Sequence, residues 1–137
     1  LDLKGKYAAA TESNAHNFIV LDDNHYSIIA MKSDEPIGLI VAKKRALPDP
    51  LSDVVEVFID VIEVDQQYQR RGVGTELMRH VNEWAVQIEA SQVRAWSEEI
   101  RTDALLMWRK MGFTFSTLTF KQEETKRHGF YVARTLP

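Results

Sequence analysis

The sequence predicts a single domain of the α/β (α+β) class, with a mixed, mostly antiparallel sheet and helices on both of its faces. Of the 137 residues, 45% are hydrophobic and 27% are charged, which is typical of one globular domain with its own core. The hydrophobic pattern alternates along the chain between the two-residue period of strands and the 3.6-residue period of helices. The resulting order, β-β-β-α-β-α-β-β, predicts the fold class.

The first two predicted strands form an antiparallel hairpin. Residues 26–31 and 37–44 are rich in apolar and β-branched side chains, and the Ser-Asp-Glu-Pro segment at residues 33–36 is a turn signal. Residues 47–50 contain two prolines, which cannot donate to a strand ladder, so we expect a loop there.

The longest predicted strand spans residues 54–64. Strict alternation along this strand predicts one apolar face, and the opposite face is mixed. Because Glu56 and Asp60 would be costly under a closed core, we expect the mixed face to be partly open or to line a cleft. The apolar face holds Val55, Val57, Ile59 and Val61, and the mixed face holds Glu56, Phe58, Asp60, Ile62 and Val64.

Two helices and three strands follow in the second half of the chain. Residues 75–89 carry apolar side chains at helical spacing, and residues 92–96 form a strand. Thr102 or Asp103 caps the second helix, which Gly112 ends. The last two strands span residues 113–120 and 129–136, with a charged, solvated loop at residues 121–128 between them.

Composition excludes several classes of function. The chain has no cysteine, which excludes disulfides, thiolate catalysis and cysteine-ligated zinc. The net charge of the chain is −3, so we expect no nucleic-acid binding. The histidines of the chain lack metal-ligand spacing, so we expect no metal site. No apolar run is long enough for a membrane span and no signal-peptide pattern is present, so we expect no membrane partner and a cytoplasmic location.

The turn between the longest strand and the following helix is the most informative segment. Its order puts free backbone N–H groups and the positive end of a helix dipole at one point, which suits a phosphate or pyrophosphate. Gly72 and Gly74 let the backbone approach an anion, and Gln69, Arg70 and Arg71 add side-chain donors.

Other uses of such a turn are separated by spacing. No Gly-Lys-Ser/Thr follows at the distance that a P-loop requires. A dinucleotide-binding fingerprint needs a third Gly or Ala where Leu77 stands. An ordinary strand-to-helix turn, with glycines for steric reasons, stays open as the alternative.

The wider context of this turn resembles a known family. Gln69-Arg70-Arg71-Gly72-Val73-Gly74 is similar to the Gln/Arg-x-x-Gly-x-Gly/Ala signature of the GNAT superfamily of N-acetyltransferases, and Val64 stands where these enzymes carry the last strand residue. Residues 104–113 resemble their later helix, which ends in an aromatic residue, a basic stretch and Gly-Phe. The resemblance implies one GNAT-like domain over residues 1–137, with atypical or truncated first helices at residues 1–17, and it allows a homodimer.

Acetyl-CoA is the cosubstrate that the resemblance implies. The pyrophosphate would lie on the N–H groups of residues 70–75, and the strand end would pair with the pantetheine arm. The N–H near Val64 would act as an oxyanion donor to the thioester carbonyl. The implied cofactor-binding residues are Ile62, Glu63, Val64, Gln69, Arg70, Arg71, Gly72, Val73, Gly74, Thr75, Arg101 and Trp108.

Acetyl transfer requires an acceptor amine that has lost its proton. The family often carries the base four or six residues before the position of Val64, which selects Asp60, since Phe58 cannot serve. Glu56 and Glu63 are weaker candidates for the same role.

The leaving thiolate raises a second requirement, and here the chain departs from the family. Trp108 replaces the frequent proton-donating Tyr, and Arg101 replaces a frequent Asn. In one alternative, Arg101 stabilises the thiolate or water protonates it, and Ser97 is a speculative substitute for the missing Tyr. In the other alternative, the protein is a catalytically weak acyl-CoA-binding regulatory module. The order of preference is an N-acetyltransferase first and the regulatory module second.

The acceptor is expected to be a primary amine on a small molecule or peptide. Residues 48–50 and 121–128 are expected at the rim of its pocket. Acidic side chains at Glu56, Asp60, Glu98 and Glu99 would suit a cationic amine.

Overall fold

The computed structural model describes residues 3–11, 13–98, 102–122 and 125–136. Six strands form one mixed sheet in the order β1-β2-β3-β4-β6-β5, in which β3 and β4 are parallel and the other neighbours are antiparallel. The elements are α1 (Leu3–Ala10), η1 (Ala15–Phe18), β1 (His25–Lys32), β2 (Glu35–Ala46), β3 (Val55–Val64), η2 (Gln66–Tyr68), α2 (Val73–Gln87), β4 (Gln92–Glu98), α3 (Thr102–Lys110), β5 (Thr114–Gln122) and β6 (Thr125–Thr135).

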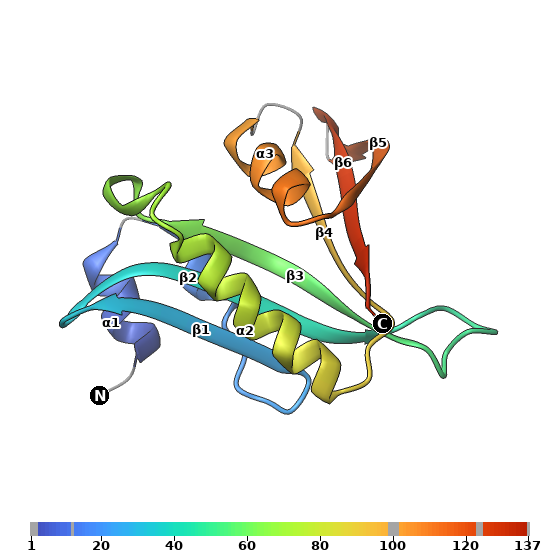
Figure 1. The fold of residues 1–137 in the computed structure, drawn as a ribbon, viewed down its shortest axis with the longest axis horizontal. Coiled ribbons are helices and arrows are strands. Elements are labelled where there is room, and N and C mark those ends of the chain that lie inside the picture. The colour runs from blue at the N-terminus through green and yellow to red at the C-terminus, as the bar shows by residue number, and fades with distance from the viewer. Residues whose placement is uncertain (1–2, 12, 99–101, 123–124, 137) are drawn as a thin grey trace.

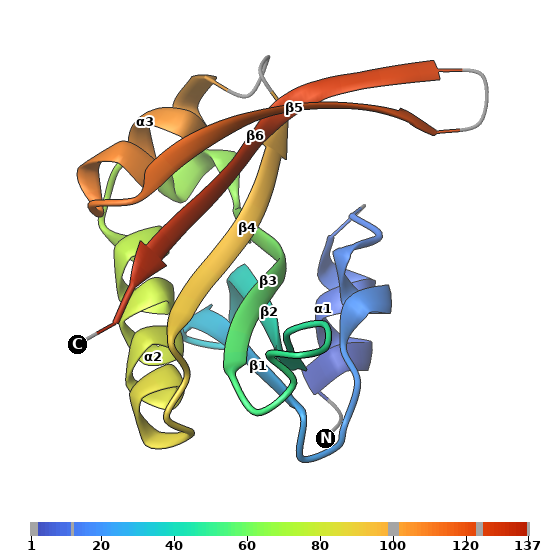
Figure 2. The ribbon, with the colours of Figure 1, turned by 90° about the vertical axis from the view of Figure 1, so that its right-hand side faces the viewer.

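Helices cover both faces of the sheet, as the sequence predicts (Figures 1 and 2). We call the face that packs on α2 and α3 the α2 face, and its core includes Met78, Val81 and Trp108. The opposite face, which packs on α1 and η1, is the α1 face, where Tyr7 lies against Leu39 and neighbouring residues. The predicted class and the helices on both faces are therefore confirmed.

The first helices, which the sequence did not place, lie against one end of the α1 face. Three successive alanines at residues 8–10 favour helix in α1, and buried Tyr7 fixes it to the sheet. The short η1 helix adds buried Ala15 to the same cluster. The helices α1 and η1 pack on residues 29, 39, 41 and 61 of β1, β2 and β3, so no helix in the described part of the chain covers the other end of this face.

Strand β3 contains a β-bulge that the sequence analysis missed. Val41 of β2 pairs with Val61, but the next residue, Ala42, pairs with Ile59, so Asp60 is the extra residue. A bulge reverses the alternation of side chains beyond it. The predicted faces are therefore wrong beyond residue 60: Val61 packs on the α1 face, and Ile62 and Val64 pack on the α2 face.

The predicted loop at residues 121–128 is also wrong. Strand β5 continues to Gln122 and β6 begins at Thr125, with Phe120 paired to Arg127 along the way. Strand β4 ends at Glu98, opposite Gly129, while the β5–β6 hairpin extends further as a two-stranded arm (Figure 2). A strand pair that extends past the sheet need not bury either face, so charged residues do not oppose its formation.

Candidate functional site

The parallel strands β3 and β4 separate before they end. Their pairing runs only from Glu56 with Gln92 to Ile59 with Ala95, although β3 continues to Val64 and β4 to Glu98. Figure 1 shows the two strands diverging toward α3. The carboxyl ends of parallel strands are a common place for ligands, and we call this opening the split.

Backbone groups of β3 face the split. The N–H of Asp65 donates to the carbonyl of Ile37 at 2.7 Å, so this pair is hydrogen-bonded across β2 and β3. Because such pairs alternate along an antiparallel ladder, Glu63 also directs its backbone to β2, whereas Ile62 and Val64 turn theirs toward β4. The alternation therefore turns the strand-end backbone groups of Ile62 and Val64 toward the split and leaves Glu63 only its side chain. The carbonyl of Val64 already accepts a hydrogen bond from Gln69 Nε2 at 3.0 Å, so Val64 offers only its N–H there.

The turn after β3 leads directly into α2 through a left-handed residue. Gly72 is the N-cap of α2 and has φ 85°, a conformation that glycine adopts without strain. The first helical bond joins the N–H of Glu76 to the carbonyl of Gly72 at 3.0 Å. The N–H groups of Val73, Gly74 and Thr75 precede this bond and have no acceptor within the helix.

The approach to these N–H groups is open. A Cβ atom placed on Gly72 would meet no atom within 4 Å. Arg70 is largely exposed and lies 3.6 Å from Asp103, an exposed ion pair that contributes little to stability. The Arg71 guanidinium lies 5.7 Å from the ring of Tyr68. Arg70 and Arg71 therefore lie around a surface that an anion can reach, whereas the amide of Gln69, the third predicted donor, bonds the carbonyl of Val64 at 3.0 Å.

Two glycines bring the surrounding elements close together. A Cβ on Gly74 would lie 3.3 Å from the sulfur of Met107, so α2 begins in tight contact with α3. A Cβ on Gly38 would lie 3.2 Å from the carbonyl oxygen of Glu63 and 3.3 Å from Val73. Sequence analysis missed Gly38, although a glycine inside a strand is a recognised sign of close backbone approach.

Asp60 lies at the point where β3 and β4 part. It is the bulged residue, directly after the last β3–β4 pair, and its side chain is 14% exposed. A carboxylate oxygen of Asp60 lies 3.1 Å from the ammonium nitrogen of Lys43. Of the predicted base candidates, Asp60 is thus the one at the start of the split.

Glu63, the second predicted carboxylate, is already bonded. The hydroxyls of Tyr7 and Ser13 both donate to it, the latter at 2.8 Å. Burial raises the pKa of the Tyr7 hydroxyl, and its hydrogen bond to Glu63 raises that pKa further. These bonds hold the N-terminal segment to the end of β3, which is a structural use of the carboxylate.

Trp108, the third predicted side chain, lies in the core. It is 2% exposed, and its ring contacts the edge of Phe113 with centroids 4.8 Å apart. The structure therefore does not bring the indole together with Asp60. Arg101, which the sequence analysis also selects, lies outside the described residues.

Glu56 forms a network that the sequence did not indicate. Its carboxylate is fully buried and accepts bonds from Arg45 at 2.7 and 3.0 Å, from Arg94 at 3.0 Å and from Gln92 at 2.9 Å. Burial alone would raise the pKa of Glu56, but the bonds from Gln92 and Arg45 and the two arginine charges together lower it. The alternating pattern predicts a partly open face at Glu56, but the carboxylate is buried and its hydrogen bonds and charge partners compensate for the burial.

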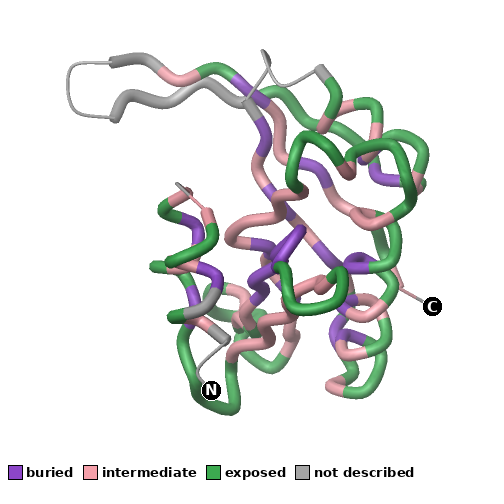
Figure 3. The backbone as a smooth tube through the Cα atoms, turned by 90° about the vertical axis from the view of Figure 1, so that its left-hand side faces the viewer, coloured by how far each residue is buried: buried purple, intermediate pink, exposed green. Residues whose placement is uncertain are grey.

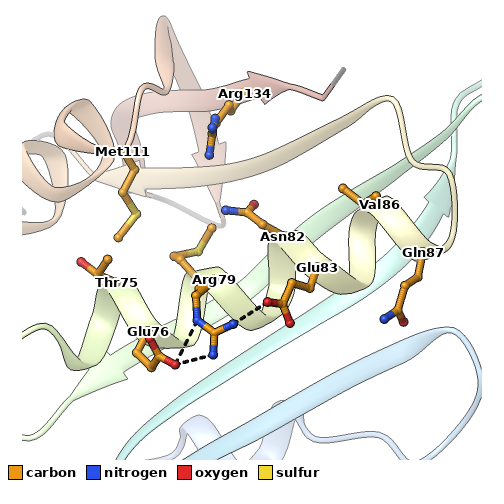
Figure 4. A pocket seen from close by; sticks show the side chains of 10 residues that line it. Thr75, Glu76, Arg79, Asn82, Glu83, Val86, Gln87, Met111 and Arg134 are labelled. Carbon is orange, nitrogen blue, oxygen red and sulfur yellow. Dashed lines mark hydrogen bonds and ion pairs between the residues drawn. The ribbon is translucent and has the colours of Figure 1, made fainter.

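A cavity of about 600 Å³ borders the turn (Figure 4). It begins at Thr75 in the first turn of α2 and continues along that helix to Gln87. Met111 and Arg134 close its other side, from the segments after α3 and on β6. No sequence pattern indicated this cavity, because it forms between elements that are far apart in the chain.

Within the residues that the structure describes, no group of three or more His, Asp or Glu side chains is arranged to hold a metal ion. None of the helices in this part of the chain is both long and apolar enough to cross a membrane.

Solved structures share this fold. Arabidopsis thaliana NAA60, in complex with a bisubstrate analogue, has 18% identity and a TM-score of 0.77, covering 97% of this chain and 90% of its own. A putative streptothricin acetyltransferase from Bacillus anthracis, in complex with acetyl coenzyme A, has 21% identity and a TM-score of 0.72, covering 88% and 67%. Arabidopsis thaliana Naa50, with the bisubstrate analogue CoA-Ac-MVNAL, has 21% identity and a TM-score of 0.68, covering 96% and 80%.

A search among curated proteins found no match by sequence. The model of the acetyltransferase (GNAT) family, however, matches residues 4–113, which is more than half of the chain. This match spans α1, the split, the turn and α3. The chain therefore belongs to the GNAT family of acetyltransferases.

Proposed function

We propose that the protein is an acetyl-CoA-dependent N-acetyltransferase that moves an acetyl group to a primary amine of a small molecule or peptide. The observation that carries this proposal is the split between β3 and β4, which ends at the free N–H groups of α2. A pantetheine arm fits such a split because its amides can pair with the backbone of Ile62 and with the N–H of Val64. The pyrophosphate fits the N–H groups of Val73, Gly74 and Thr75, with Arg70 and Arg71 as additional donors.

The reaction is a direct transfer between two substrates. The neutral amine nitrogen attacks the thioester carbonyl carbon, the C–N bond forms, and the carbonyl oxygen becomes negative. An N–H group on β3, at Ile62 or Val64, stabilises this oxyanion, which is worth about 3 kcal/mol in comparable sites. The C–S bond then breaks, and an amide and the CoA thiolate result.

Asp60 is the proposed proton acceptor for the amine. Its carboxylate belongs to a side chain that is 14% exposed and lies at the start of the split, which supports this role. The thiolate takes its proton from water in this proposal, because the indole of Trp108 is buried and far too weak an acid.

Ligand-dependent stability tests the cosubstrate. Acetyl-CoA must raise the melting temperature, since a ligand selective for the folded state stabilises that state. Gly72→Asp is expected to abolish the shift, because its carboxylate would occupy the place of a phosphate. Gly72→Asn is the matched control: it has nearly the same shape without the charge, and asparagine tolerates the left-handed conformation.

The contrary results are equally clear. If neither acetyl-CoA nor free CoA at millimolar concentration changes the melting temperature of the parent protein, the proposal is wrong. If the Asp and Asn variants lose the shift equally, the turn acts through backbone shape rather than by holding an anion.

A catalytically weak acyl-CoA-binding module is the second candidate. The burial of Trp108, at the position where the family frequently carries Tyr, favours it. Release of free thiol from acetyl-CoA in the presence of a panel of amines separates the two candidates. Binding without thiol release would favour the module.

A further inference from the structure

The α1 face carries a compact group of charges beside the split. We define the Phe58 cluster as the aromatic ring of Phe58 with its charged neighbours on that face. The nitrogen of Lys43 lies 5.7 Å from the ring centroid, and the guanidinium carbons of Arg45 and Arg94 lie 4.3 and 5.9 Å from it. The cluster members are Lys43, Arg45, Glu56, Phe58, Asp60 and Arg94.

Both carboxylates of the cluster already have a cationic partner. Glu56 is fully buried, and each of its oxygens accepts at least one N–H group. Asp60 is paired with Lys43. Three positive and two negative charges leave the cluster with a net charge of +1. The earlier expectation that acidic side chains here would attract a cationic amine is thus opposed by their pairing.

The three cationic side chains, in contrast, have N–H groups that do not bond to the carboxylates of the cluster. The side chains of Lys43, Arg45 and Arg94 are 34%, 38% and 28% exposed. Arg94 bonds Glu56 through Nη2, and its Nε, although buried, has no hydrogen-bond partner among the described residues. Arg45 bonds Glu56 through Nε and Nη2, which leaves Nη1 outside that contact. These side chains can therefore bind a carboxylate while Glu56 stays satisfied.

The position of the cluster relates it to the reaction. Phe58 pairs with Arg94 one residue before Ile59 and Ala95, the last pair that joins β3 to β4. Asp60 directly follows that last pair, where the split begins. Successive strand residues are about 3.3 Å apart, so an anion held here lies within a few bonds of an amine at the split. A net positive charge also favours the neutral amine over the ammonium, and the neutral form is the nucleophile.

From this arrangement the geometry points to an amino carboxylate as the acceptor, with its carboxylate held by Lys43, Arg45 and Arg94 and its amine at Asp60. The inference rests on the proposed acetyltransferase function and narrows its substrate class. It excludes polyamines as the preferred acceptors, because a second positive charge would meet the cationic cluster.

Paired probes test this inference. Each pair is an L-amino acid and its amide, which differ only in the carboxylate: leucine and leucinamide, phenylalanine and phenylalaninamide, lysine and lysinamide. Spermidine serves as the polycation. In the best pair, we expect kcat/KM to be at least about tenfold higher for the acid than for its amide. The amine of the amide is less basic and is more often neutral, so its intrinsic reactivity alone would favour the amide.

Charge-neutral variants identify the residues. Lys43→Gln removes one cation and leaves the Glu56 network intact, and it is expected to remove most of the preference for the acid over the amide. Lys44→Gln is the matched control, since Lys44 is the next residue of β2, is exposed, and lies on the opposite face. Arg45→Gln is a second test, with the acetyl-CoA-dependent rise in melting temperature as the check that each variant is folded.

The outcomes separate this inference from the proposed function. Turnover without preference for the acids, preference for spermidine, or equal effects of Lys43→Gln and Lys44→Gln would overturn the inference and leave the acetyltransferase intact. Calorimetric binding of the acids in the presence of CoA, lost in Lys43→Gln, would support the carboxylate site even if no amine were acetylated. Absence of binding by all three acids in that titration, together with no turnover of them, would overturn the inference.

Discussion

Glu56 places a negative charge in the sheet with no exposed surface, and three neighbouring side chains make this arrangement stable. Among the described residues, Arg45, Arg94 and Gln92 supply the hydrogen bonds that its carboxylate receives. A buried carboxylate without such partners would be protonated or excluded. The network thus turns a costly residue into a fixed support for the arginines beside the split.

Glu56→Gln is expected to destabilise the protein by about 3 kcal/mol, because two arginine charges lose their buried partner. Chemical denaturation measures this loss, and Glu35→Gln, at an exposed position of β2, is the control. An equal effect of the two substitutions would contradict a special role for the buried carboxylate.

The same residue gives a pH dependence. The folded state lowers the pKa of Glu56 below its ordinary value of 4.5, so its contribution is fully present above pH 4.5 and is lost as the pH falls through the folded pKa. We expect the melting temperature of the parent protein to fall more steeply below pH 4.5 than that of Glu56→Gln. Parallel curves would show that other carboxylates dominate acid unfolding.

At the scale of elements, the bulge in β3 decides which groups enter the split. Without Asp60 as an extra residue, Ile62 and Val64 would turn their side chains to the α1 face and their backbones to β2. The bulge instead turns the backbones of Ile62 and Val64 toward the split and places Asp60 where β4 departs. The inserted residue Asp60 thus changes the register between β2 and β3, lies where the split begins, and is itself the candidate base.

The second half of the sheet depends on close contact between β4 and β6. A Cβ on Gly129 would lie 2.3 Å from the carbonyl oxygen of Ser97 and 2.7 Å from the ring of Trp96. Gly129→Ala must therefore shift backbone rather than a flexible side-chain end, and we expect a loss of about 1–3 kcal/mol in the free energy of unfolding. A denaturation midpoint equal to that of the parent would show that β4 and β6 separate without cost.

For the whole molecule, the split divides the sheet into two parts that few backbone contacts join. β1, β2 and most of β3 lie on one side, and β4, β6 and β5 lie on the other (Figure 1). Four residue pairs connect β3 to β4, and the α2 face core connects the parts through side chains. Figure 3 shows buried residues concentrated where the strands run together and exposed residues along the outer loops and helices.

A cosubstrate in the split would add contacts between these parts. Amide hydrogen exchange is therefore expected to slow at residues 62–64 and 72–75 when acetyl-CoA is added, because bound N–H groups exchange only after release. Strand β1, at the far edge of the sheet, is the internal control. Slower exchange at β1 alone, or no change at the turn, would contradict the proposed binding mode.

Much of the fold follows from local chemistry in the sequence. The apolar stripe of α2, the apolar runs of β1 and β2, and the glycine turn after β3 are visible as patterns, since each depends on residues near one another in the chain. Residues 1–17 were not interpretable, because α1 has only a weak apolar pattern and relies on Tyr7 packing against β2 and β3. The charged hairpin arm was misread as a loop, because backbone pairing does not require apolar residues.

The sequence by itself determined that this chain has a strand, an anion-suited turn and a helix in that order, and with them its resemblance to the GNAT family. Only the tertiary structure decided which groups work together: that Asp60 is bulged, that Glu63 and Glu56 are already bonded, and that Trp108 is buried. The physical reason is that a pattern records the preference of each segment for water or core. The pairing of charges and the register of strands arise between segments that are distant in the chain.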